Sequence, residues 1–310
     1  NMGQCFFKCY RNTIPVFTRA ILSCFGCHRC CFRPTDEDLI AEFCTYAKNN
    51  DVKGLTLLAG RVRILKGIKY EIGQLCSRVP REAASSNSSA KHNPRRISAL
   101  HSAAMHDRLE IILYMLKMTG CKPNGNREIP CQYTPLHIAA KEGYTALTNL
   151  LIKYKVHLDS LDWKKNTALI LAASNGHQRC VKALIDHGAL VNVRNGNGFN
   201  ALIGAIINGR QKCAIMLIKL GSDLTITDVH GNTPLHLAIV KGDVEVVKFL
   251  LQCDAKVYAF NKYQASTLDE AKRCQNPEIF EVVQRGWSKY YEDVKKKRDA
   301  EDAEEEEEDV

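Results

Sequence analysis

Apolar residues recur along most of the chain at the spacing of short amphipathic helices, and these helices come in pairs. A first short helix reads as residues 136–140, Leu-His-Ile-Ala-Ala, and a glycine turn follows it at Gly143. A second helix carries apolar residues at helical spacing, as over 244–251. An alternating stretch such as 190–193 then leads into a tight turn, for example at Gly198. The pattern predicts helix pairs separated by extended segments with hairpin-like turns.

The helix pairs recur at a constant interval. The phrase that begins at Thr134 is followed by equivalents that begin at 167, 200, 233 and 266, each 33 residues after the one before. A fixed period of this length is the signature of a repeat architecture, in which each unit packs only against its neighbours. One more unit begins at Ser98, 36 residues before Thr134, which places three inserted residues in the turn around 122–132.

These units resemble ankyrin repeats. The phrases that carry the resemblance are TPLHIAAKEG at 134–143, TPLHLAIVKG at 233–242, SNGH at 174–177 and HGALVN at 187–192. The resemblance covers residues 97–285. It implies an all-α ankyrin-repeat solenoid, in which helix-turn-helix pairs are joined by β-hairpin-like turns. It also implies a scaffold or adaptor that binds other proteins.

The two central repeats depart from the family motif. Ala168 and Ala201 replace its proline, and isoleucines replace its histidine at 170 and 203. These repeats therefore lose a hydrogen-bonding side chain, and we expect packing to hold them. Where the histidine is kept, at His137 and His236, we expect it to brace the start of the helix and not to serve in catalysis or metal binding.

The remaining segments divide by composition. Residues 36–76 contain a degenerate N-terminal cap, in which 43–58 imitate a helix-turn-helix unit. Residues 77–96 are Ser-rich and basic and predict a flexible linker. The last repeat becomes polar over 266–285, which suits a C-terminal cap. Residues 286–310 predict a short charged helix, at 287–297, and a disordered acidic tail.

Charge separates the body of the chain from its end. The last eleven residues carry eight acidic side chains and no basic one, so their removal changes the formal net charge from +9 to +17. A strongly basic body favours a partner with an acidic surface, an anionic membrane or nucleic acid. No nucleic-acid recognition motif accompanies the charge, and no phosphate loop, nucleophile elbow or metalloprotease motif is present. We therefore expect no enzyme activity, no cofactor and no small-molecule substrate.

The N-terminal segment, residues 1–35, has an unusual composition. It holds five basic residues, several aromatic residues and six cysteines, with no acidic residue. Basic and aromatic residues together suit a membrane surface, and cysteines in such a segment are candidates for palmitoylation. If Met2 is the initiator, Gly3 is a candidate for myristoylation. The predicted lipidation residues are Gly3, Cys5, Cys9, Cys24, Cys27, Cys30 and Cys31.

Other interpretations of the same segment stay open. Cys24, Cys27, Cys30 and Cys31 have the residue type for a structural zinc site, and 24–28 fit the C-x-x-C-H pattern of covalent haem. An acid-free basic start is also typical of a mitochondrial targeting segment. No secretory signal and no apolar run of about 20 residues is present, so we expect a reducing, cytoplasmic compartment with peripheral membrane attachment.

The resemblance places partner contacts on the turn tips and on the exposed side of each first helix. Aromatic residues recur at the tips, where solubility alone would favour polar groups. The predicted turn-tip contacts are Trp163, Lys164, Asn166, Arg194, Asn197, Phe199, Val229, His230, Asn232, Phe260, Lys262 and Tyr263. The predicted first-helix contacts are Ser174, Asn175, Ile207, Asn208, Val240 and Lys241.

Two alternative functions stay open beside a membrane-tethered scaffold. A stack of repeats followed by an acidic tail is similar to the NF-κB inhibitors, which favours a soluble regulator of a signalling or transcription factor, in a nuclear location. The basic body of this chain counts against that alternative, because those inhibitors mask a basic partner. The second alternative is a structural subunit of a larger assembly, possibly an organellar one.

Overall fold

A computed structural model describes residues 36–66, 99–118, 124 and 132–308 of the chain. The chain divides into two compact units, one of residues 1–103 with 110–122, the other of residues 104–109 with 123–310. The linker at 77–96 and the N-terminal segment lie outside the described residues, so both predictions stay untested. None of the described helices combines the length and the low charge that crossing a bilayer requires.

The first unit contains the helix pair of the predicted cap. Helix α3 (Asp36–Asn49) and helix α4 (Val52–Lys66) pack against each other. They meet at Asn50, whose φ of 60° reverses the chain, and at Asp51, whose carboxylate accepts a hydrogen bond from the Gly54 amide at 2.8 Å. Buried apolar side chains, among them Leu39 and Leu55, face the inside of the pair. Helices α6 (Ala99–Met105) and α7 (Leu109–Met118) follow.

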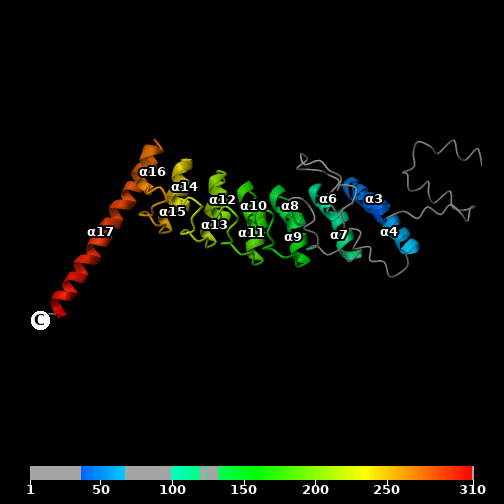
Figure 1. Cartoon of the computed structure of the whole chain (residues 1–310), viewed down its shortest axis with the longest axis horizontal. Coiled ribbons are helices and arrows are strands. Elements are labelled where there is room, and N and C mark those ends of the chain that lie inside the picture. Colours follow the sequence, from blue (N-terminus) through cyan, green and yellow to red (C-terminus); the bar gives the residue numbers. More distant parts are fainter. Residues whose placement is uncertain (1–35, 67–98, 119–123, 125–131, 309–310) are drawn as a thin grey trace, which may run out of the picture. The chain divides into compact units, whose positions relative to one another are not determined.

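The second unit is a stack of helix pairs in two layers (Figure 1). First helices pack on first helices along one layer, and second helices pack on second helices along the other. The first helices are α8 (Pro135–Glu142), α10 (Ala168–Asn175), α12 (Ala201–Ile207), α14 (Pro234–Lys241) and α16 (Thr267–Arg273). The second helices are α9 (Thr145–Lys153), α11 (Gln178–Asp186), α13 (Gln211–Lys219), α15 (Val244–Gln252) and α17 (Pro277–Glu308).

Each first helix begins at the residue that opens the 33-residue phrase. Thr134, Thr167, Asn200, Thr233 and Ser266 all have extended backbone and accept a hydrogen bond from the third amide of the helix. This is the N-cap arrangement, which pairs an amide that the helix itself leaves without a partner. The all-α fold and its period are therefore confirmed, and the repeating phrase is the set of helix starts.

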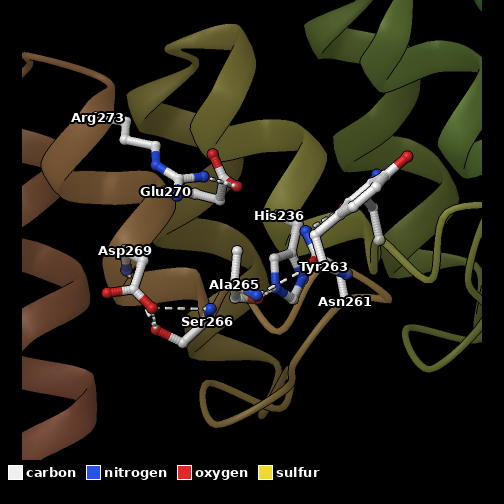
Figure 2. A network of polar contacts seen from close by, with 9 residues as sticks. His236, Asn261, Tyr263, Ala265, Ser266, Asp269, Glu270 and Arg273 are labelled. Atoms are coloured by element: carbon white, nitrogen blue, oxygen red, sulfur yellow. Dashed lines mark hydrogen bonds and ion pairs between the residues drawn. The ribbon is translucent and has the colours of Figure 1, made fainter.

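The retained histidines also join one repeat to the next. In His236 the Nδ1 atom lies 2.8 Å from the Thr233 hydroxyl. The Nε2 atom of the same ring lies 3.3 Å from the Ala265 carbonyl of the following turn (Figure 2). His137 makes the equivalent contacts to Thr134 and to the Asn166 carbonyl. In the central repeats, Ile170 and Ile203 contribute only their amides to the caps, as predicted.

Asn200 is a weak point in the central repeats, because its buried Nδ2 has no hydrogen-bond partner among the described residues. Threonine would keep the capping oxygen and remove the unpaired amide nitrogen. We expect Asn200→Thr to raise the free energy of unfolding by about 1 kcal/mol. Urea unfolding followed by circular dichroism measures this, with Asn197→Thr, an exposed site, as the control. An unchanged or lower stability of Asn200→Thr would contradict the prediction.

Two predictions about local structure are wrong. The stretch 190–193 is not extended: residues 191–192 form a turn, and the described part of the chain holds one isolated β-bridge, Phe260 with Ser266, and no strand. The C-terminal region is not a short helix followed by a disordered tail, because α17 runs without a break from Pro277 to Glu308. Glutamate is a good helix former, and a helix that has already started extends at little cost.

The described cysteines are free thiols of two kinds. Cys180 and Cys213 are buried, as their place in apolar helical patterns predicts. Burial raises the pKa of the Cys213 thiol to about 11 and that of Cys44 to about 12, so both stay protonated. Cys253 is exposed and Cys274 is half-buried.

Candidate protein-interaction surface

Four turn tips project between the first helices, and each closes on itself in the same way. The tips are 162–166, 195–199, 228–232 and 261–265, and in each the first residue donates its amide to the fifth carbonyl at 2.9–3.1 Å. The first tip is joined to the second and the third to the fourth, since Gly196 donates to the Lys164 carbonyl and Lys262 to the His230 carbonyl. Arg194, just before the second tip, donates to the Thr227 carbonyl just before the third. The turn-tip surface, defined as these four tips with the flanking residues Arg194 and Phe260, is therefore a hydrogen-bonded row.

Two buried aspartates hold the tips in shape. Asp162 accepts hydrogen bonds from the Lys164 and Asn166 amides at 2.8 and 2.7 Å, and its side chain is only 3% exposed. Asp228 does the same for His230 and Asn232. A carboxylate that accepts several amide bonds is a structural anchor, so neither acid is available to a partner.

Asn166, one of the predicted partner contacts, is buried in the structure and hydrogen-bonded within the row of tips. It is 8% exposed; its Nδ2 donates to Asp162 and its Oδ1 accepts from Asn195 Nδ2 at 2.8 Å. Asn232 occupies the same place two repeats later. Its Nδ2 donates a hydrogen bond to the Asp228 carboxylate, and its Oδ1 accepts one from Asn261 Nδ2. These amides form a ladder along the row of tips. The aspartate four residues before each asparagine is the signal that points to this role.

The exposed side chains of the tips are large and apolar. Trp163 is 56% exposed and Tyr263 is 71% exposed, while Val229 and Phe260 are about half exposed. Phe199 is half-buried. Tyr263 stacks on His230, with its hydroxyl 3.1 Å from the ring Nδ1. Four of the five predicted apolar or aromatic tip contacts thus lie open at the surface.

Basic side chains lie among these apolar groups. The Lys164 ammonium lies 4.9 Å from the centre of the Trp163 ring, a cation–π contact. Arg194 Nη2 donates to the Thr227 carbonyl at 2.5 Å, which ties it to the next repeat. Lys262 and Asn197 are exposed. Lys165, which the sequence prediction missed, is exposed beside Lys164.

The predicted first-helix contacts differ in exposure. Val240, Lys241 and Asn208 are exposed, whereas Ile207, Ser174 and Asn175 are half-buried. Asn175 and Asn208 each donate to a carbonyl of their own helix, at Leu171 and Gly204. Their side-chain amides therefore hydrogen-bond to backbone carbonyls near the C-terminal ends of α10 and α12. Val240 and Lys241 remain as exposed residues of this face.

Neither lipidation nor the zinc alternative is tested by the structure. Gly3 and the six cysteines from Cys5 to Cys31 lie outside the described residues. Within the ranges that the structure does describe, no group of three or more His, Cys, Asp and Glu side chains is placed to hold a metal ion.

Comparison with known families gives one result. A family model described as ankyrin repeats, in three copies, matches residues 79–162, 136–228 and 193–261. Together these matches cover residues 79–261, more than half of the chain. A search of curated proteins found no match.

Proposed function

The chain belongs to the ankyrin-repeat family, and on this premise we propose that it is a membrane-tethered adaptor whose turn-tip surface binds an acidic partner protein. Ankyrin repeats are protein-interaction modules, so binding of another protein is the general function. The acidic character of the partner and the membrane tether are the specific parts of the proposal.

The charge of the turn-tip surface supports an acidic partner. Its two acids, Asp162 and Asp228, are buried and already accept amide hydrogen bonds, so they neither face the solvent nor repel a partner. The exposed ionised groups of the tips are Lys164, Lys165 and Lys262, all of them basic. This separation of buried acids from exposed bases is the observation that carries the proposal, because complementary charge steers association and selects partners.

The aromatic groups on the same surface support protein binding over non-specific attraction of anions. Exposed Trp163, Phe260 and Tyr263 offer rigid apolar area beside the lysines. Aromatic anchors next to cations are typical of binding hot spots. The expected partner segment carries carboxylates interleaved with apolar side chains.

A paired charge reversal tests the acidic-partner proposal. Lys164→Glu with Lys262→Glu leaves the buried anchors untouched and should weaken binding of a genuine partner by about tenfold or more. The matched control is Lys182→Glu with Lys212→Glu, which changes the same net charge on exposed positions of α11 and α13. Proximity labelling in cells identifies candidate partner proteins. Titration calorimetry on each purified partner with the wild type and the variants then measures the loss of affinity. Equal binding by both double variants would refute the proposal.

The N-terminal composition supports the tether. Five basic residues without an acid attract anionic headgroups, and the aromatic residues favour the interface. One acyl chain gives only marginal membrane binding, so several cysteines beside a basic cluster suit stable attachment.

A cysteine exchange tests the tether. Replacing the six cysteines between Cys5 and Cys31 by serine should move the protein from the membrane to the soluble fraction and abolish labelling by acyl exchange. The matched control is Cys253→Ser with Cys274→Ser, which removes the more accessible thiols of the repeats. Persistent membrane association of the N-terminal variant would show that the tether proposal is wrong.

A further inference from the structure

Asparagine followed by glycine recurs along the chain, and this pair is prone to a reaction of its own. Glycine has no side chain, so its backbone nitrogen stands unhindered beside the preceding side-chain amide. Four such pairs lie wholly within the described residues, and they begin at Asn175, Asn195, Asn197 and Asn208. The reaction needs a mobile asparagine side chain and a free glycine nitrogen, so the hydrogen bonds of each pair decide how fast it reacts.

Three of these asparagines are held by their side chains. Asn175 and Asn208 each donate Nδ2 to a carbonyl of their own helix, at 2.9 and 2.8 Å. Asn195 donates Nδ2 to Asn166 Oδ1 at 2.8 Å, and its Oδ1 accepts two backbone amides of its own tip at 2.9 Å. Each of the three amide groups must give up these hydrogen bonds before it can turn toward the glycine nitrogen that follows.

Asn197 differs from the other three. Its side chain is exposed, and no other described residue forms a hydrogen bond with its amide group. The Gly198 nitrogen donates to the Asn195 carbonyl at 3.0 Å, within a single turn at the end of the tip. By contrast, the Gly196 nitrogen is bonded across to Lys164 in the preceding repeat. A local opening of one turn therefore frees both reacting groups of the Asn197–Gly198 pair.

We propose that Asn197 is a site of spontaneous deamidation, with water as the co-reactant. The Gly198 nitrogen attacks Asn197 Cγ, the Cγ–Nδ2 bond breaks, and the proton from the Gly198 nitrogen leaves with Nδ2 as ammonia. The product is a five-membered succinimide ring. Water then opens the ring at one of two bonds. Cleavage between the nitrogen and Cγ gives aspartate, and cleavage between the nitrogen and the main-chain carbonyl carbon gives isoaspartate.

Either product changes the turn-tip surface. Each adds a carboxylate to the tip that lies beside the exposed Lys164 and Lys165. Isoaspartate also routes the main chain through Cγ, which lengthens the turn by one carbon atom and displaces the Gly198 amide from the Asn195 carbonyl. An added negative charge repels an acidic partner, so partner binding weakens as the protein ages. Only this consequence rests on the proposed function, because the reaction itself needs no partner.

Incubation of the purified full chain in heavy-oxygen water, in mildly alkaline buffer, tests the reaction. Digestion in ordinary water followed by tandem mass spectrometry locates the oxygen taken up. In the folded protein, Asn197 should take up label about ten times faster than Asn175, Asn195 and Asn208. In concentrated urea the four rates should become similar, because the fold no longer holds the other three side chains. Equal rates in the folded protein, or label in urea but none at folded Asn197, would overturn the proposal.

The products and one variant test the role of Gly198. Attack by its nitrogen should give isoaspartate together with aspartate, and isoaspartyl methyltransferase detects the isoaspartate. Aspartate alone would mean that water attacks the side-chain amide directly, which would overturn the succinimide route. Asn197→Gln keeps a neutral amide at this exposed position, but its longer side chain disfavours ring closure. Label in the tip peptide should therefore fall by about tenfold in this variant, and an unchanged rate would assign the reaction to another residue and overturn the proposal.

Discussion

Replacing His236 by alanine should lower the free energy of unfolding of the repeat stack by about 3 kcal/mol. The side chain is fully buried and joins two repeats, because Nδ1 accepts from the Thr233 amide while Nε2 faces the Ala265 carbonyl. The substitution leaves a cavity, an open carbonyl and a helix start without half of its capping box. No exposed position of the stack combines these three losses.

The same histidine should make stability depend on pH. Burial lowers the pKa of His236 below its usual 6.5, although the hydrogen bond to the Ala265 carbonyl opposes part of the shift. The unfolded chain therefore takes up a proton at a higher pH than the folded chain does. The contribution of His236 to the free energy of unfolding is fully present above pH 6.5. It is lost as the pH falls from there toward the pKa of the folded state. The hydrogen-bond pattern agrees, since an Nδ1 acceptor and an Nε2 donor describe the neutral ring.

Urea unfolding at about pH 7.5 and about pH 5.5 measures both effects in one series. The wild type should lose stability at the lower pH, and His236→Ala should lose less. His187→Ala is the control, because His187 is exposed at the C-cap of α11 and its ring Nδ1 lies 2.8 Å from the Ala183 carbonyl of the preceding helix. If His236→Ala kept the whole pH dependence of stability that the wild type shows, that dependence would arise from other titratable groups.

The fold could be predicted from the sequence because each repeat encodes its own boundaries. A capping residue every 33 positions and a glycine of positive φ at Gly143, Gly176 and Gly242 fix where helices begin and end. These are local signals, so a single repeat carries them without knowledge of its neighbours. The acidic end of α17 was misread because like-charge repulsion and helix propensity act in opposite directions there, and propensity wins.

The candidate surface was harder to predict than the fold. Asn166 and Asn197 are both asparagines at turn tips, yet one is buried in a ladder and the other is exposed. The difference depends on the partner side chains Asp162 and Asn195, which come from two repeats. The Asp162 spacing is a signal within one repeat, whereas the contact with Asn195 exists only once neighbouring repeats are packed together.

The formal net charge of the sequence likewise does not predict which charges the turn-tip surface exposes. The sum over the sequence counts Asp162 and Asp228 against the basic residues around them, although both acids are buried under the tips. Because both acids are buried, the ionised side chains that the tips expose are the three lysines Lys164, Lys165 and Lys262. The partner chemistry proposed here thus follows from which charges the fold hides, and the composition alone understates it.

Trp287→Ala should loosen the packing of α17 on the last repeat and lower the stability of that end of the stack by about 2 kcal/mol. The indole Nε1 donates to the Thr267 hydroxyl at 3.0 Å, and that hydroxyl donates in turn to the Val257 carbonyl. A second contact supports the joint, because Tyr258 and Tyr290 stack with ring centres 4.2 Å apart. The joint lies between the last turn and the part of α17 beyond residue 285, which the repeat period alone does not predict.

Because a repeat stack unfolds in parts, the loss should be local. Native-state hydrogen exchange should speed up in α16 and α17 of Trp287→Ala, while α8 and α10 keep their protection. The control is Lys289→Ala, which shortens an exposed side chain on the same helix and should cost at most about 0.5 kcal/mol. Uniform loss of protection across the stack would mean that the end is not a separate unit.

Trp287→Phe separates packing from hydrogen bonding at this joint. Phenylalanine keeps an aromatic ring but lacks the donor, so Thr267 loses one partner and keeps the Val257 carbonyl. We expect about 1 kcal/mol of the loss from the missing hydrogen bond, and the rest from the missing ring. If the phenylalanine variant lost as much as the alanine variant, the hydrogen bond to Thr267 would account for the whole contribution of Trp287. The buried Ile279 and Val283, with the Tyr258–Tyr290 stack, would then supply the apolar part of the attachment of α17.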